Sequence, residues 1–251
     1  MPGVSLPRGG LSRAVRDGPR LVVPAYFHPA LRPGDWEWLA ARPDLVRSVV
    51  LNISSGPGDA PRPEFAAAAE RLAAAGIGIL GYVDTAYGHR PPRRVAADIA
   101  RYLDWYPVTG VCMDRAAAEP ASVTHYALLA GQARAMGAGT VLFNHGTHPA
   151  EEYAAHADLL GVFEGTWQAY RRMRPPLWTR HWPAAAFYHV VHSVPPEQAA
   201  AAWRLAARRR AATAYVTERS GPNPYDALPA WLPDARGGRE GLGDDRERRG
   251  A

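Results

Sequence analysis

Two acidic residues that each end a short apolar run are the residues of this chain best suited to chemistry. Asp114 ends the run Gly110–Asp114, and Glu164 ends the run Leu159–Glu164. Burying a carboxylate is costly unless it has a partner, whereas barrel enzymes place catalytic groups at the carboxyl ends of their parallel strands. Two such acids can share a reaction in which one gives a proton and the other attacks, or activates a water. We therefore expect Asp114 and Glu164 to be catalytic.

The two acids have different neighbours in the sequence. Glu164 follows Phe163 in an aromatic setting that should raise its pKa, so we expect it to be the acid. Asp114 precedes Arg115 and should stay charged. We expect Arg115 to point away from the site, because successive strand side chains face opposite sides, and to form an outer ion pair.

Both acids also have a purely structural alternative. Asp114 would then bond backbone amides or pair with Arg115, and Glu164 would pair with Arg90 or Arg171.

The elements that must position these acids alternate between short apolar runs and Ala-rich amphipathic stretches, which indicates βα repeats around a parallel sheet. Helices are expected over Pro63–Ala75 and Glu197–Arg210, and another is expected to begin at Thr147 and Pro149. The eight expected strands are Arg20–Tyr26, Ser48–Asn52, Gly78–Val83, Gly110–Asp114, Thr140–Asn144, Leu159–Glu164, Ala186–Val191 and Ala212–Thr217.

This count predicts the fold class α/β, as a single-domain (β/α)8 TIM barrel over residues 20–236. Residues 1–19 and 237–251 lack apolar periodicity and are expected to be disordered tails. A doubly wound open sheet is the alternative, but no G-x-G-x-x-G follows the first strand.

Polar and aromatic residues gather in the segments that follow the strands, which is where a barrel carries its function. Tyr87 and Trp167 stand in expected loops and suit stacking on sugar rings. Tyr82 is as consistent with the core, and Asp84 is better explained by an Asx-turn. The residues expected to bind substrate are Tyr26, Asn52, Tyr82, Asp84, Tyr87, Asn144, His145 and Trp167.

Several function classes are disfavoured. The nine histidines lack metal-site spacing, so we expect no metal and no cofactor. Cys112 is the only cysteine, which excludes an internal disulfide. The net charge of +5 comes from arginine without any lysine and predicts no nucleic-acid partner. Residues 1–20 lack an apolar signal region and no membrane-length run follows, so a cytoplasmic protein without membrane contact is expected. The oligomeric state stays open.

Several of these segments together resemble the spherulation-specific family 4, the spherulin-4-like group, over roughly residues 21–233. The matching motifs are N-x-x-S-G-P-G at 52–58, G-Y-V-x-T-x-Y-G-x-R at 81–90, G-V-x-x-D at 110–114, N-x-G-T at 144–147, F-E at 163–164 and Y-D-A-L-P at 225–229. The resemblance implies a (β/α)8 barrel among glycoside hydrolases that cut α-1,4-linked galactosamine-type polysaccharides without a cofactor.

The chain departs from the family pattern at the fourth strand. The pattern commonly reads Asp-Glu there, whereas this chain reads Asp114-Arg115. Further departures are His145 in place of a usual Pro, and Ile53-Ser54 in place of Pro-Asn. We expect a hydrolase that cleaves an amino-sugar-containing glycan, and the alternative is an inactive carbohydrate-binding protein on the same scaffold.

Overall fold

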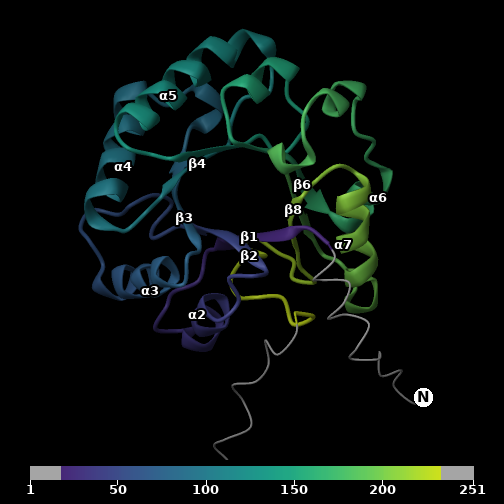
Figure 1. Cartoon of the computed structure of the whole chain (residues 1–251), viewed down its shortest axis with the longest axis horizontal. Helices are drawn as coiled ribbons and strands as arrows, with labels where there is room; N and C mark the ends of the chain where they lie inside the picture. The colour runs from purple at the N-terminus through teal and green to yellow at the C-terminus, as the bar shows by residue number, and fades with distance from the viewer. Residues whose placement is uncertain (1–17, 233–251) are drawn as a thin grey trace, which may run out of the picture.

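A closed barrel of eight parallel strands forms the centre of the protein (Figure 1), as expected from the sequence. This is a computed structural model, and it describes residues 18–232. The strands are β1 (Arg20–Ala25), β2 (Val46–Leu51), β3 (Gly78–Asp84), β4 (Gly110–Asp114), β5 (Thr140–Asn144), β6 (Leu159–Thr166), β7 (Phe187–His192) and β8 (Thr213–Val216). Most of their residues are buried, because packed side chains fill the inside and helices cover the outside.

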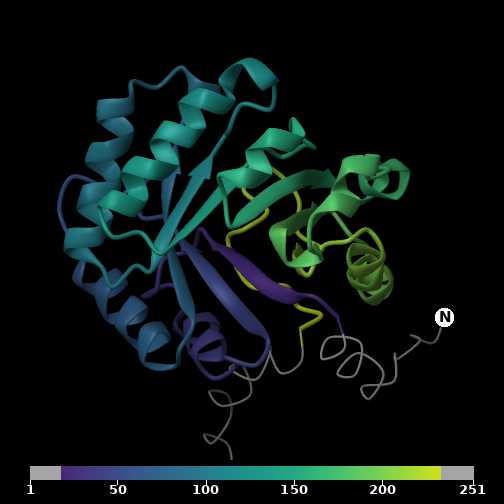
Figure 2. The same cartoon turned by 45° about the horizontal axis from the view of Figure 1, so that its top comes forward.

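Helices cover the outside of the barrel (Figure 2). They are α2 (Pro33–Ala40), α3 (Pro63–Ala74), α4 (Pro92–Trp105), α5 (Val123–Ala135), α6 (Trp167–Arg172) and α7 (Ala199–Arg208). The first three begin with proline, whose missing N–H costs nothing in a first turn. In α3 the buried residues Phe65, Ala69 and Leu72 lie on one stripe, which turns the helix towards the sheet.

The connection from β5 to β6 differs from the sequence prediction. Instead of an α-helix from Thr147 and Pro149, it forms a five-residue 3₁₀-helix, Glu151–Ala155. The backbone before it is held by tertiary bonds, since the amides of His145 and Gly146 both donate to the carbonyl of Gly161. Too few residues remain before β6 for an α-helix to gain stability.

The last described segment takes the place of an eighth helix. After β8 it runs without regular structure to Leu232 and packs against the barrel and against α2. Its anchors are the indole of Trp231, which donates to the Val216 carbonyl at 2.8 Å, and the amide of Leu228, which donates to Asp35 at 3.1 Å. We call residues 218–232 the C-terminal strap.

The expected tails at residues 1–19 and 237–251 lie outside the described residues, except for Gly18 and Pro19. Within the described part of the chain, no helix has both the length and the apolar character needed to cross a bilayer.

Candidate active site

Asp114 and Glu164 meet at the carboxyl-end mouth of the barrel, with Asn144 of β5 between them. The side-chain nitrogen of Asn144 donates to Asp114 Oδ1 and to Glu164 Oε2, at 2.7 Å in each case. These two acid oxygens therefore lie no further apart than twice that distance. An amide NH₂ has two hydrogens, so Asn144 commits both of them to the two acids.

Two tyrosines complete the hydrogen bonding of the acids. Tyr82 donates to Asp114 Oδ2 at 2.8 Å, and Tyr225 donates to Glu164 Oε1 at 2.6 Å. Each of the four carboxylate oxygens thus accepts one bond. Tyr26 stands edge-on to both tyrosine rings, with ring centres 5.6 and 5.5 Å away. We call these six residues, Tyr26, Tyr82, Asp114, Asn144, Glu164 and Tyr225, the carboxylate network.

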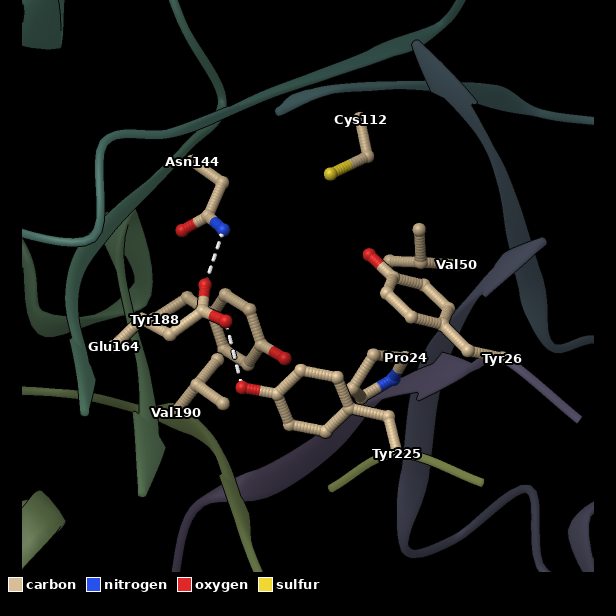
Figure 3. A pocket seen from close by; sticks show the side chains of 9 residues that line it. All are labelled: Pro24, Tyr26, Val50, Cys112, Asn144, Glu164, Tyr188, Val190 and Tyr225. Atoms are coloured by element: carbon tan, nitrogen blue, oxygen red, sulfur yellow. Dashed lines mark hydrogen bonds between the residues drawn. The ribbon is translucent and has the colours of Figure 1, made fainter. Parts of the chain in front are cut away.

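A small cavity opens beside the carboxylate network (Figure 3). The hydroxyl of Tyr26 points into it, and the thiol of Cys112 faces the same space. Burial and the nearby acids raise the pKa of Cys112, so the thiol is protonated and inert. The lining residues are Pro24, Tyr26, Val50, Cys112, Asn144, Glu164, Tyr188, Val190 and Tyr225.

The pKa of Asp114 is shifted in a direction that disfavours the charged form expected from the sequence. Burial, reinforced by the charge of Glu164, raises its pKa above the usual range, although bonds from Asn144 and Tyr82 oppose the shift. Arg115 does not hold Asp114 in its charged form, because its guanidinium is bonded elsewhere. Burial and the adjacent acid also raise the pKa of Tyr82, which therefore stays a neutral donor.

Arg115 lies outside the carboxylate network, as expected. It pairs with Asp84 at 3.0 Å, and its guanidinium stacks over the Tyr87 ring with 5.1 Å to the ring centre. The other oxygen of Asp84 accepts a bond from the Ala86 amide at 2.7 Å, which is the Asx-turn expected for this residue. Tyr87 is about half exposed beside Arg115.

The remaining predicted binding residues do not reach the cavity. His145 is buried with Nδ1 2.8 Å from the Ala117 carbonyl, because its ring packs against Tyr153 behind the barrel wall. Trp167 begins α6 instead of lying in a loop, and its buried indole donates to Gln198.

Asn52 stands at the end of β2 and is used locally. Its side-chain oxygen accepts a bond from the Gly56 amide at 3.2 Å. Asn52 therefore holds the turn after β2 and does not line the cavity.

Gly161 is required for the geometry of Asn144. A Cβ at this glycine would lie 2.2 Å from Asn144 Oδ1, so any side chain would push the amide away from the acids. The same carbonyl oxygen has no hydrogen-bond partner. Turning the amide over would aim this oxygen at two carboxylates, so the observed orientation is the only favourable one.

Tyr225 and Tyr188 are site residues that the sequence prediction missed. Tyr225 belongs to the irregular C-terminal strap, where periodicity gives no signal, and only its place in the Y-D-A-L-P motif pointed to it. Tyr188 lies inside β7, so its position in the sequence predicts a core residue. Among the described residues, no group of three or more His, Cys, Asp or Glu is arranged to hold a metal ion.

The sequence profile of the spherulation-specific family 4 matches residues 20–235. The chain belongs to this family. Spherulin-4 from Physarum polycephalum is 30% identical over 150 residues, which are 58% of this chain. The match spans 44% of that relative's length.

Two solved structures show the same fold as this family member. Sph3 from Aspergillus clavatus, in complex with GalNAc, superposes with a TM-score of 0.76 at 24% identity, covering 87% of this chain and 96% of that chain. The glycoside hydrolase domain of PgaB (BpsB) from Bordetella bronchiseptica gives a TM-score of 0.53 at 14% identity, covering 88% and 97%.

Proposed function

We propose that this protein is a glycoside hydrolase that cleaves an amino-sugar-containing polysaccharide or oligosaccharide, with Asp114 and Glu164 as its catalytic pair. The observation that carries the proposal is the Asn144 amide, which bridges the two carboxylates at the barrel mouth. Glycosidic cleavage needs a proton donor and a second carboxylate within a few ångströms. The carboxylate network supplies both beside a cavity.

In this proposal Asp114 is the acid and Glu164 is the nucleophile, the reverse of the sequence prediction. Burial and the charge of Glu164 raise the pKa of Asp114, and this shift favours the protonated form that an acid needs. Bonds from Tyr225 and Asn144 fix the Glu164 carboxylate beside the cavity. The close approach of the acids favours the spacing of retaining enzymes, about 5–5.5 Å, over the about 6.5–9.5 Å of inverting ones.

The proposed sugar class rests on the neighbours in structure. Sph3 was solved with GalNAc, and the PgaB domain is a glycoside hydrolase domain. The cavity of this chain offers aromatic walls from Tyr26, Tyr188 and Tyr225 that suit the apolar faces of a sugar ring.

The test is a cleavage screen on galactosamine and N-acetylgalactosamine polymers with the wild type, Asp114→Asn and Glu164→Gln. We expect each substitution to lower turnover by at least about 100-fold while binding stays measurable. Asp104→Asn and Glu70→Gln change exposed acids on the outer helices α4 and α3, and serve as matched controls. Cleavage that persists undiminished in both site variants would show that these acids are structural. Proton NMR of the first anomer released tests retention.

A second candidate function is carbohydrate binding without catalysis. The observation that favours it is Arg115, which stands where the family pattern commonly has an acid. Wild-type protein that binds amino-sugar oligosaccharides but cleaves none of them, together with unchanged affinity in Asp114→Asn, would support this alternative.

A further inference from the structure

Three residues outside the cavity form one connected surface at the barrel mouth: Asp84, Tyr87 and Arg115, which we call the rim platform. Arg115 Nη1 donates to Asp84 Oδ2 at 3.0 Å, and the guanidinium covers the Tyr87 ring. The Tyr87 residue is 53% exposed and the Arg115 side chain 48% exposed. The rim platform thus presents an aromatic ring, hydrogen-bond donors and an acceptor to solvent, with the arginine charge balanced by Asp84.

The backbone beneath the rim platform is held in an unfavourable conformation. Ala86, Tyr87 and Arg115 have φ of 48°, 55° and 51°, a region that costs residues with a side chain about 1 kcal/mol or more each. Two bonds between the loops hold them there: the Tyr87 amide donates to the Arg115 carbonyl at 2.6 Å, and the Thr85 amide donates to the Asp114 carbonyl at 3.0 Å. Such strain persists only where surroundings impose it, and it concentrates at binding sites.

The rim platform adjoins the acid side of the carboxylate network. Asp84 pairs in register with Asp114 across β3 and β4, and Arg115 follows Asp114 directly. Neighbouring strands lie about 4.8 Å apart, so the platform flanks Asp114 on the side away from Glu164. When Asp114 protonates the glycosidic oxygen, the sugar that leaves with this oxygen lies over the rim platform.

We propose that the rim platform is a subsite for an uncharged sugar residue on the leaving side of the cleaved bond. This inference rests on the proposed function and adds Arg115, at which the chain departs from its family pattern, to the residues that contact substrate. The free face of the Tyr87–Arg115 stack receives the C–H face of the ring. Asp84 and the remaining guanidinium N–H groups bond its hydroxyls. The balanced charge favours a neutral residue over a uronic acid, whose carboxylate Asp84 repels.

The test measures binding of N-acetylgalactosamine and of its α-1,4-linked oligomers of two to six units by calorimetry, in the Glu164→Gln background that prevents turnover. Tyr87→Ala and Arg115→Ala should weaken binding of the oligomers about tenfold, the loss of about 1.4 kcal/mol that one stacking contact provides. Binding of the monosaccharide at the carboxylate network does not require the rim platform and should be unchanged. Tyr87→Phe keeps the ring and should keep oligomer affinity.

Arg101→Ala is the matched control. Arg101 also stacks on an aromatic ring, that of Trp105, pairs with an aspartate, and has a side chain 48% exposed, but it lies on the outer helix α4. Oligomer affinity that is unchanged in Tyr87→Ala and Arg115→Ala overturns the subsite, and so does an equal loss for monosaccharide and oligomers. If the wild type cleaves these polymers while the platform variants bind normally, only this inference fails. If the wild type neither binds nor cleaves them, the proposed function fails with it.

Discussion

Asn144 holds Asp114 and Glu164, the proposed catalytic pair, through a single nitrogen, and Gly161 makes that possible. Gly161→Ala places a methyl group 2.2 Å from the amide oxygen, so Asn144 must turn away and release both acids. We predict a loss of turnover of about 100-fold or more, because displacement of catalytic groups by about 1 Å costs that much. Kinetics on the polymer found in the cleavage screen measure it.

Gly131→Ala is the control for this substitution. Gly131 lies inside α5 with open space around its Cβ position, so alanine there should raise the free energy of unfolding by about 0.5–1 kcal/mol and leave turnover unchanged. Equal activity of the two alanine variants would contradict the role given to Gly161.

Ionised Asp114 is expected to destabilise the fold. A carboxyl whose pKa is raised in the folded state binds its proton more tightly when folded, so stability present at acidic pH is lost as pH rises through the folded pKa. We predict that Asp114→Asn unfolds at a higher temperature than the wild type at pH 7, with the difference shrinking below about pH 4. Thermal unfolding of both proteins from pH 4 to pH 7 tests this prediction. A stability gain from Asp114→Asn that is smaller at pH 7 than at pH 4 would contradict it.

At this scale the sequence predicts that the two acids meet, but not the direction of the pKa shift at Asp114. Asp114 and Glu164 are visible because each follows an apolar run. The upward shift of the Asp114 pKa is not visible, because it depends on burial, on where Arg115 points and on the bonds that Tyr82 and Asn144 make. The sequence also misplaces the side chain of His145 for a related reason. A polar residue after a strand can pack behind the barrel wall as easily as at the barrel mouth.

Among the elements, the strands are well predicted and the connections are not. Buried parallel strands appear in a sequence as unbroken apolar runs. The bounds of all eight strands lie within two residues of the expected ones. The turn that places Trp167 at the start of α6 and the 3₁₀-helix after β5 depend on tertiary bonds that leave no periodic signal. The C-terminal strap, which supplies Tyr225, is irregular for the same reason.

Arg209 caps α6 from the end of α7. It is buried, donates to the carbonyls of Tyr170 and Arg171, and stacks on the Tyr170 ring with 4.7 Å to its centre. Arg209→Gln removes the guanidinium bonds to both carbonyls and the stacking on Tyr170, and we predict a loss of about 2 kcal/mol in the free energy of unfolding. Urea unfolding of this variant beside Arg208→Gln, its exposed neighbour in α7, measures the effect. Equal losses in both would show that the cap contributes nothing.

For the whole molecule, two buried histidines and one half-buried histidine predict instability in acid. Burial lowers the pKa of His145 and His148 to about 4 and that of His189 to about 3. The unfolded chain therefore binds more protons below about pH 6.5, and stability falls as pH drops from there towards 4. The slope is about 1.4 kcal/mol per pH unit for each histidine that titrates only on unfolding.

Urea unfolding at pH 7, 5.5 and 4.5 measures this slope. His189→Gln should reduce it, whereas His89→Gln, at an exposed position, should leave it unchanged. A slope that is the same in all three proteins would contradict the prediction.

The closure of the barrel also fixes when the carboxylate network is completed during synthesis. β1 pairs with β8, joining residues about 190 positions apart, and Tyr225 reaches Glu164 only from the strap beyond β8. While the chain is being synthesised, β1 has no β8 to pair with and forms an open sheet edge. Both acids have then been made long before Tyr225, which bonds Glu164. The nascent chain therefore completes the carboxylate network only after the strap has left the exit tunnel.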